Sequence, residues 1–487
     1  MHLNYRIIVR ILGILLLILG SAMLPSIIAA FIYGEPGPLR AFVLSSVILI
    51  SSGIAVTLKV RPGPATLRLQ EGYIIVALCW LSASVLGAAP YLLSGVTGSF
   101  ADALFDSTAG FTTTGATVFD VLNFPKSLLL WKAVSHLLGG MGILVFAISI
   151  LPALGVGGQK IYKAEAPGPT ADKVASRTSD SARILYLTYL VFGFVEFIML
   201  SFSPMSLFDA LIHTFGSIST SGLTNHIGGL SYYNSIYIEA VISVFCILAS
   251  INFTLYAHVM QGKWKDFFSN TELRVFLLTM IAAALLVSVA LYACGTYESV
   301  ADSLRFGVLQ VISIATTSGH AVVDFMDWPD FCKALLFILM FIGGCAASTC
   351  GSIKVIRVAV MFKLIVRGIK KSIHPRRIIA VKLGGRAISA ETVSKIASFI
   401  LTYLAIFAIS NIVLSLQNLD FITTVSASAS LLSNTGCIFG PAESGAPSFS
   451  LFAAPLKLYL SLLMIVGRLE LFTVLVLFSP KLHGHRS

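Results

Sequence analysis

Charged side chains are scarce in this sequence. Asp, Glu, Lys and Arg make up 11% of its 487 residues, whereas 56% of the residues are hydrophobic. Soluble domains carry about a quarter charged residues, so this composition excludes a soluble multidomain protein. The sequence predicts an all-α integral membrane protein.

Motifs of enzymes that act on nucleotides, peptides or lipids are also missing. The Gly262-Lys263 pair is followed by Trp264 and has no glycine-rich phosphate-binding run before it, which excludes a Walker A site. The sequence contains no His-Glu-x-x-His and no Gly-x-Ser-x-Gly motif. Its seven cysteines are an odd number and define no disulfide framework. We therefore expect no enzyme activity and no covalently bound cofactor.

The net charge of +11 first suggests a nucleic-acid binder. The basic residues, however, lie in short runs between apolar stretches that are long enough to cross a bilayer, and no long basic face results. We expect no nucleic-acid partner. Ten candidate spans lie at 11–33, 41–58, 73–94, 128–155, 184–203, 233–260, 275–295, 333–366, 396–416 and 455–478.

The distribution of charge predicts the orientation of these spans. Of the 33 basic residues, 26 fall at the termini and on alternate connections, which predicts that both termini are cytoplasmic. The opposite connections carry twelve carboxylates, Asp106 among them, and six bases, including Lys132. An acidic outer surface favours a cation as ligand, although acidic loops also arise for solubility alone.

Four related segments recur on the outer side. Each has an Asp, an apolar stretch, three small polar residues and a Gly, and the distance from Asp to Gly is 13, 13, 17 and 16 residues. The segments run from Asp102 to Gly115, Asp209 to Gly222, Asp302 to Gly319 and Asp420 to Gly436.

Each segment predicts a short helix, with Asp as its N-cap, that enters the membrane and ends in a glycine-centred turn. About a dozen helical residues reach roughly 18 Å, or halfway through the hydrocarbon. Non-helical backbone at that depth must be surrounded by protein or line a wet cavity, so four such loops predict one shared axis. The alternative is four ordinary turns, since Thr-Gly and Ser-Gly are common in loops.

The four segments resemble those of the Trk/Ktr/HKT superfamily of potassium transporters, most closely its TrkH branch. The resemblance extends over about 73–480 and includes Trp131…Gly139-Gly-Met-Gly142, Gly343–Thr349, Lys354…Arg357 and Gly467–Phe472. It implies four tandem helix–pore loop–helix repeats in a pseudo-fourfold arrangement, preceded by two extra N-terminal transmembrane helices.

The resemblance also implies a potassium filter, in which backbone carbonyls bind the ion. His320 after the third glycine and Cys437 after the fourth depart from the residues usual in the family. So do Cys350 and Ser352, which interrupt a stretch that is usually richer in glycine. The filter residues implied are Thr113, Thr114, Gly115, Thr220, Ser221, Gly222, Thr317, Ser318, Gly319, Asn434, Thr435 and Gly436.

A gate is predicted within 333–366, because about 34 residues are too many for one straight crossing. Small residues fill its middle, which close helix packing alone would also explain. The excess length and the resemblance favour an intramembrane gate loop containing Gly343, Gly344, Ala346, Ala347, Ser348 and Gly351.

Arg468 is the second gate candidate. Its guanidinium lies roughly 15 Å from the inner end of a predicted span, where a charge needs a partner or a wet cavity. We expect it to donate hydrogen bonds to carbonyls of the gate loop. A structural ion pair with Glu196 or Glu239 is the alternative.

The predicted function is potassium uptake across the bacterial inner membrane, with K⁺ as the transported ion. The resemblance implies a homodimer and a cytoplasmic nucleotide-binding regulatory ring of the TrkA type. A secondary transporter of an organic solute, a sodium-coupled cation symporter and a membrane-embedded enzyme are the alternatives. The expected divisions are a two-helix extension (1–70), repeat 1 (71–160), repeat 2 (161–262), repeat 3 with a broken second helix (263–370) and repeat 4 (371–487).

Overall fold

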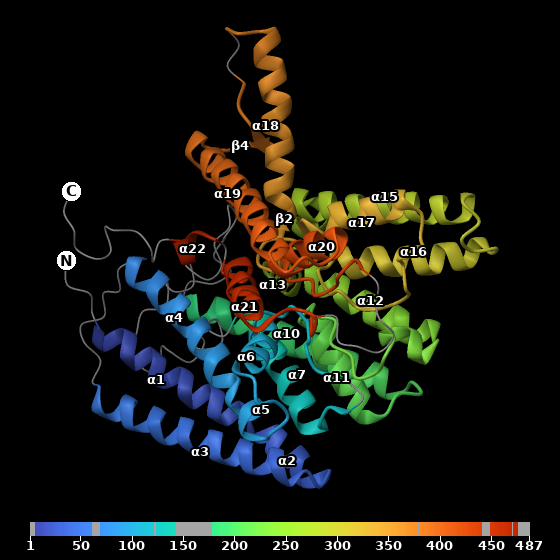
Figure 1. Ribbon diagram of the computed structural model, residues 1–487. Helices are drawn as coiled ribbons and strands as arrows, with labels where there is room; N and C mark the ends of the chain where they lie inside the picture. The colour runs from blue at the N-terminus through green and yellow to red at the C-terminus, as the bar shows by residue number, and fades with distance from the viewer. Residues whose placement is uncertain are drawn as a thin grey trace.

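Within the residues that the structure describes, the protein is helical apart from two sheets of two short strands each. The computed structural model in Figure 1 describes residues 5–60, 69–120, 123–142, 178–376, 379–440, 449–469 and 471–475. Within these residues six helices are long and apolar enough to cross a membrane, or seven if one bent pair counts as a single span. The prediction of an all-helical membrane protein is confirmed. The predicted inner residues Lys160, Lys163, Lys173, Arg177, Lys481 and Arg486 lie outside the described residues.

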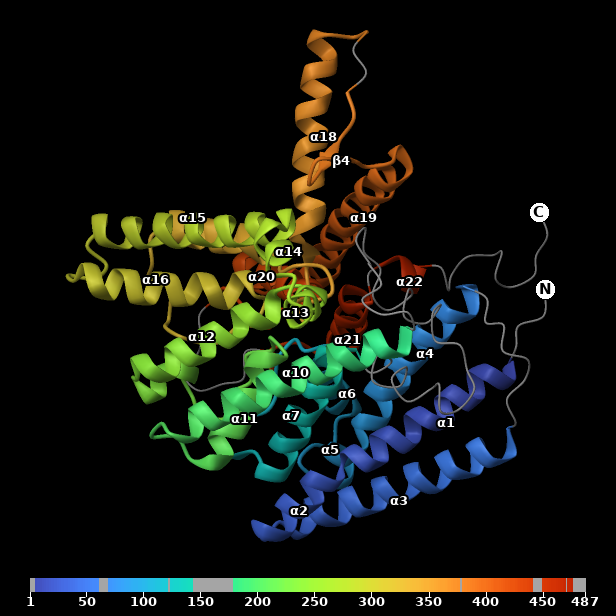
Figure 2. The same cartoon turned by 180° about the vertical axis from the view of Figure 1, so that it is seen from behind.

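The N-terminal extension contains the two predicted spans. Helices α1 (Tyr5–Ala22) and α2 (Leu24–Ile32) form the first, with a break before Pro25, and α3 (Pro36–Lys59) forms the second. They pack together along one edge of the molecule (Figures 1 and 2). Glu35, between α2 and α3, accepts hydrogen bonds from the backbone N–H groups of Lys126 (2.8 Å) and Ser127 (3.1 Å) and so ties the extension to the rest of the chain.

The remaining chain forms a long helix, a short helix and a second helix four times in succession. The first helices are α4 (Leu69–Gly87, continued by α5, Ala89–Leu93), α10 (Thr178–Ser201), α15 (Thr271–Ala293) and α19 (Ala390–Ser415). The short helices are α6 (Phe100–Phe111), α11 (Leu207–Ile218), α16 (Val300–Ala315) and α20 (Phe421–Ser433). The second helices are α7 (Lys126–Gly140), α12 (Ile236–Ser250), α17 (Asp330–Met340) and α21 (Ala454–Arg468).

These helices pack in a closed order. Each short helix contacts the first and second helices beside it in sequence, and each second helix also contacts the short helix that follows. Thus α7 packs on α11, α12 on α16 and α17 on α20, and α21 returns to α6. The last group of helices therefore contacts the first.

The second helices are shorter than the predicted spans. As a correction, breaks also occur within 233–260 and 455–478, where continuous spans were expected. Helix α12 ends at Ser250 and meets α13 (Phe253–Met260) at an angle of 91°. Helix α21 ends at Arg468 and is followed by α22 (Phe472–Leu475). Hydropathy missed these breaks because apolar residues continue on both sides of them. Helix α7 ends at Gly140, and the rest of its predicted span, from residue 143, lies outside the described residues.

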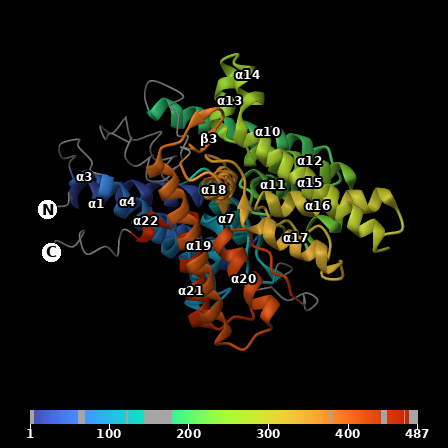
Figure 3. The same ribbon diagram turned by 90° about the horizontal axis from the view of Figure 1, so that it is seen from above.

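The break expected in the third unit is confirmed. After α17 the chain forms two parallel two-residue strands, β1 (Ile342–Gly343) and β2 (Ile353–Lys354), and then α18 (Val355–Ile373). Helix α18 projects from the body in Figures 1 and 2 and is seen along its axis in Figure 3. A hairpin of β3 (Lys382–Leu383) and β4 (Arg386–Ala387) leads back to α19. The connections elsewhere include η3 (Gly229–Tyr233) and α14 (Trp264–Ser269).

The short helices begin at side-chain caps, but mostly not at the predicted ones. Asp420 is the N-cap of α20 and accepts hydrogen bonds from the N–H groups of residues 422 and 423. In the other three helices the prediction was wrong, because the N-cap is a serine three residues before the aspartate: Ser99, Ser206 and Ser299. The aspartate lies in the first turn, where its charge favours the positive end of the helix dipole.

Replacing Ser299 by Ala removes the cap of α16 and should cost about 1 kcal/mol of stability, whereas Asp302→Asn should cost less because it weakens only a charge–dipole contact. Both effects are measured as shifts in the midpoint of thermal unfolding of the purified protein in detergent, with size-exclusion chromatography as the readout. A larger drop for Asp302→Asn than for Ser299→Ala would show that the aspartate is the true cap.

Candidate functional site

The loops that follow the four short helices share one unusual backbone conformation. In each loop the glycine has a positive φ, and so does the residue two positions before it. The non-glycine residues are Thr113 (55°), Thr220 (53°), Thr317 (54°) and Asn434 (56°). Three of these are β-branched threonines, for which the left-handed region is strained, and such strain persists only where the surroundings hold it.

The hydrogen bonds within the four loops are also equivalent. The residue before each glycine donates its N–H to the carbonyl five residues back, as in Thr114 to Ala109 (2.9 Å) and Ser318 to Ser313 (2.9 Å). Hydroxyl groups pair across each loop at 2.7, 3.0, 3.2 and 2.8 Å. These four pairs are Thr112 with Thr114, Ser219 with Ser221, Thr316 with Ser318 and Ser433 with Thr435.

The loops meet one another in a ring. A Cβ atom built on Gly115 would overlap the carbonyl oxygen of Ser221, and one on Gly222 would overlap that of Ser318. In the same way Gly319 abuts Thr435, and Gly436 abuts Thr114, so the fourth loop closes on the first. Only glycine permits this approach, which explains why all four segments have a glycine at this position.

The twelve filter residues predicted from the sequence therefore lie together. Among the described residues, no hydrogen-bond donor reaches the backbone carbonyls of these twelve. In each loop the amide of the residue before the glycine and the paired hydroxyls are occupied, as described above. Buried carbonyls in this state are suited to a desolvated cation, since carbonyl oxygens can replace its hydration shell.

The predicted gate loop, residues 343–352, passes against the loops that end at Gly222 and Gly319. The Gly351 N–H donates to the Thr317 hydroxyl (3.0 Å), and the Thr349 and Thr220 hydroxyls lie 3.3 Å apart. The Cys350 thiol contacts the Thr316 carbonyl at 3.0 Å. This segment thus lies directly beside the second and third loops.

The same segment fills the break in α12. The N–H groups of Cys345 and Thr349 donate to the carbonyls of Ser250 (2.9 Å) and Ala249 (3.2 Å), and the Ala347 carbonyl accepts from the Phe253 N–H (3.0 Å). The interruption of α12 is satisfied by the interruption after α17, which is why both backbones can leave the helix in an apolar interior.

Other contacts fix the shape of the gate loop. The buried carboxylate of Glu272 accepts the Ala346 N–H at 2.6 Å, and the Ser348 hydroxyl donates to the Cys345 carbonyl at 2.6 Å. Ala347 and Ser352 have positive φ values of 51° and 61°. The predicted Gly343 lies in β1, and Gly344 and Gly351 pack against backbone of α12 and the fourth loop.

Arg468, the last residue of α21, joins three parts of the chain. Its guanidinium donates to the Thr349 carbonyl of the gate loop (2.6 Å) and to the Gly139 and Gly140 carbonyls at the end of α7 (2.7 Å each). The expected bond to the gate loop is confirmed. Of the two carboxylates considered as alternative partners, Glu239 forms an ion pair with Arg305 and Glu196 accepts a hydrogen bond from Ser217.

Sequence reasoning missed that three ionisable side chains are buried beside this site: Glu272 and the ion-paired Asp106 and Lys132. Both charges of the pair had been assigned to outer loops. The signal that could have revealed them is their position: Asp106 and Lys132 stand inside apolar runs rather than at the polar ends of those runs.

Comparisons with known proteins agree with this geometry. Residues 38–486 match a family model, TrkH, described as a cation transport protein. The Trk system potassium uptake protein TrkH of Halomonas elongata is 34% identical over 481 residues, covering 98% of this chain and 99% of that protein. TrkG of the Escherichia coli Trk system is 32% identical, with 98% of each chain covered.

A solved structure is similar over nearly the whole length. The crystal structure of the potassium transporter TrkH from Vibrio parahaemolyticus superposes with a TM-score of 0.87 at 31% identity, covering 98% of this chain and 99% of that one. These matches are to transporters and not to enzymes. The chain therefore belongs to the TrkH family of cation transport proteins.

Proposed function

We propose that this chain takes up K⁺ across the bacterial inner membrane through the ring of four loops. The observation that carries the proposal is the ring itself: four loops with the same strained backbone, each glycine against the next loop, and carbonyls that no donor among the described residues reaches. The names of the relatives, which are Trk system potassium uptake proteins, support K⁺ as the transported ion.

In this proposal the backbone carbonyls of the twelve loop residues are the filter ligands. Each short helix points its C-terminal, partially negative end at the same region, which adds to the attraction for a cation. Potassium loses its hydration water more readily than smaller cations, so a ring of rigid carbonyls favours it. The transported ion is a substrate, and the filter needs no resident cofactor.

The four helical units are the pore repeats, and they surround one pseudo-fourfold pore. The closed packing order, from α21 back to α6, supports this arrangement. The proposed divisions remain 1–70 for the extension and 71–160, 161–262, 263–370 and 371–487 for the repeats. An organic-solute transporter would instead need side chains arranged around a larger midplane pocket.

Residues 343–352 form the gate in this proposal, and Arg468 stabilises its closed state. The support is that Arg468 binds a gate-loop carbonyl and two α7 carbonyls at once, so the guanidinium connects the moving segment to fixed helices. Its positive charge beside the filter also opposes the presence of a cation there.

A homodimer and a cytoplasmic nucleotide-binding ring of the TrkA type complete the proposed assembly, with both termini of the chain in the cytoplasm. The surface offered for the ring is the exposed basic end of α18, with Lys370 and Lys371, together with Arg376 just after the helix. The alternative for these residues is that they serve only as a topology signal.

Replacing Gly115 by Ala tests the filter. The added methyl group would overlap the Ser221 carbonyl and strain a φ of 71°, so the K⁺/Na⁺ permeability ratio should fall by about tenfold, or about 1.4 kcal/mol of discrimination. Ion flux into proteoliposomes measures the ratio. Gly98→Ala is the matched control, since no heavy atom lies within 4 Å of the Cβ added there. An unchanged ratio in Ala variants of all four glycines would rule out a carbonyl filter.

Arg468→Ala tests the gate. Loss of its charge-assisted hydrogen bonds should destabilise the closed state and raise K⁺ flux by about fivefold, which corresponds to about 1 kcal/mol. Arg10→Ala is the matched control, because Arg10 also donates to a carbonyl, that of Val60 (3.0 Å), but in the N-terminal extension. A folded Arg468→Ala protein that conducts less than the parent would contradict the proposed role.

Reversing the charges of Lys370 and Lys371 to Glu tests the ring contact. Co-purification of the nucleotide-binding subunit should fall by about tenfold, as expected when charges at an interface meet like charges. The same reversal at Lys263 and Lys265, also exposed and predicted to be cytoplasmic, should leave co-purification unchanged. If the variant with Glu at 370 and 371 binds the nucleotide-binding subunit normally, the proposed contact is wrong. These lysines would then serve only as a topology signal.

A further inference from the structure

An ion pair lies buried behind the first filter loop. Asp106 of α6 and Lys132 of α7 pair directly, and their side chains are 0% and 2% exposed. Two charges in an apolar interior are costly to bury, and removing one leaves the other without compensation. The cost of burying such a pair is offset where its charged groups also form hydrogen bonds with other parts of the chain.

The pair holds the three residues that follow the filter glycine Gly115. The Lys132 ammonium donates to the Ala116 carbonyl at 2.8 Å. The Asp106 carboxylate accepts the Thr117 hydroxyl at 2.8 Å and the Val118 N–H at 2.9 Å. Asp106 thus accepts two hydrogen bonds and Lys132 donates one, and these three bonds fix three consecutive residues.

The other three loops are held by different groups. In the fourth loop the Ser426 hydroxyl bonds both the N–H (2.9 Å) and the carbonyl (3.0 Å) of Phe439. In the third the Ser313 hydroxyl donates to the His320 carbonyl at 2.9 Å. In the second, the Asp209 carboxylate accepts a hydrogen bond from the side-chain amide of Asn225 rather than from the backbone. The positions nine residues before the glycines, equivalent to Asp106, are His213, Gln310 and Ala427.

The first loop also has space into which it could relax. A cavity of about 60 Å³ lies between the first and second loops and is lined by Gly115, Thr117, Lys132, Gly222 and Thr224, among others. Thr113 in the same loop holds a φ of 55°, which the loop does not favour by itself. Because the first loop is strained and borders this cavity, another group must hold its backbone in place. The Asp106–Lys132 pair is positioned to do so.

We propose that Asp106 and Lys132 are positioning residues that hold the outer half of the first filter loop and so set how well the pore discriminates K⁺ from Na⁺. This inference rests on the proposed filter function and deepens it. Neither side chain touches the ion. Without the pair, the segment after Gly115 relaxes toward the cavity, the carbonyls of the first loop leave the ring, and smaller cations pass.

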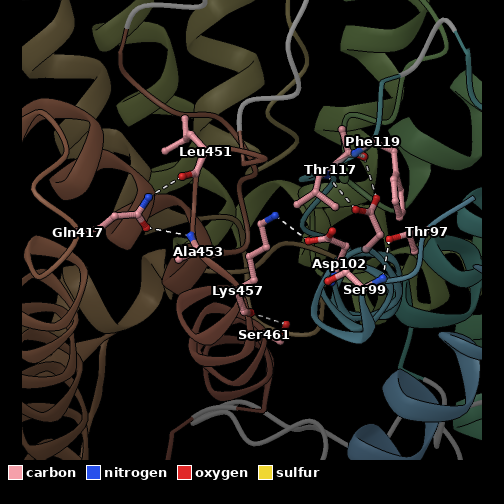
Figure 4. A network of polar contacts seen from close by, with 12 residues as sticks. Thr97, Ser99, Asp102, Thr117, Phe119, Gln417, Leu451, Ala453, Lys457 and Ser461 are labelled. Carbon is pink, nitrogen blue, oxygen red and sulfur yellow. Dashed lines mark hydrogen bonds and ion pairs between the residues drawn. The ribbon is translucent and has the colours of Figure 1, made fainter. Parts of the chain in front are cut away.

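The chain contains a matched control pair of the same residue types. Lys457 of α21 and Asp102 of α6 lie 2.6 Å apart, with side chains 10% and 24% exposed. Figure 4 shows Lys457 directed at Asp102, with Thr117 and Phe119 nearby. This pair also joins a pore helix to a second helix, but among the described residues it binds no backbone that follows a filter glycine.

The test measures the K⁺/Na⁺ permeability ratio of the full chain in proteoliposomes, with folding checked by size-exclusion chromatography. Asp106→Asn and the double variant D106N/K132Q should each lower the ratio by about tenfold, the scale of a lost charge-assisted hydrogen bond. The double variant leaves no unpaired charge, so it remains informative if the single variant fails to fold. Lys132→Arg keeps the positive charge and should retain most of the discrimination between K⁺ and Na⁺. The control variant D102N/K457Q should leave the permeability ratio unchanged.

A parental ratio in folded D106N/K132Q would overturn the inference and leave the filter proposal intact. An equal loss in D102N/K457Q would also overturn it, because any pore-helix ion pair would then serve. If the parent chain itself shows no preference for K⁺, the proposed function is overturned, and this inference falls with it.

Discussion

A backbone group inside a membrane has no water to bond, and this constraint organises the structure. Four loops leave the helical state after the short helices, and each must place its N–H and C=O groups somewhere. The N–H groups before the glycines turn back to the preceding helix, and the hydroxyls pair with each other. The carbonyls are what remains, and the glycines let neighbouring loops approach closely enough to share one central region.

The same constraint accounts for the broken helices around the ring. Helix α12 can end at Ser250 because the gate loop donates to its terminal carbonyls. Helix α7 can end at Gly140 because Arg468 donates to the carbonyls of Gly139 and Gly140. Each interruption is compensated by another segment, so the four glycine loops, residues 343–352 and Arg468 form one bonded network.

The four glycine loops, the break after α17 and the bond from Arg468 to the gate loop could be predicted from the sequence. Repetition exposes the loops, excess length exposes the break, and a lone arginine in an apolar helix demands a partner. Three features could not be predicted in this way. Serine and aspartate are both good N-caps, so spacing alone did not distinguish Ser99 from Asp102. Hydropathy does not register a break at Ile251 or Leu469. The Asp106–Lys132 pair joins residues 26 positions apart, and no local pattern reveals such a contact.

The central claim is that carbonyls of all four loops bind the same permeating ion. The most direct measurement is a crystal structure of the protein soaked in Rb⁺ or Tl⁺, in which anomalous scattering locates the ion. We expect density on the axis of the ring, within coordination distance of carbonyls from the loops that end at Gly115, Gly222, Gly319 and Gly436. Density at a side-chain site elsewhere in the helix bundle, with none between the loops, would contradict it.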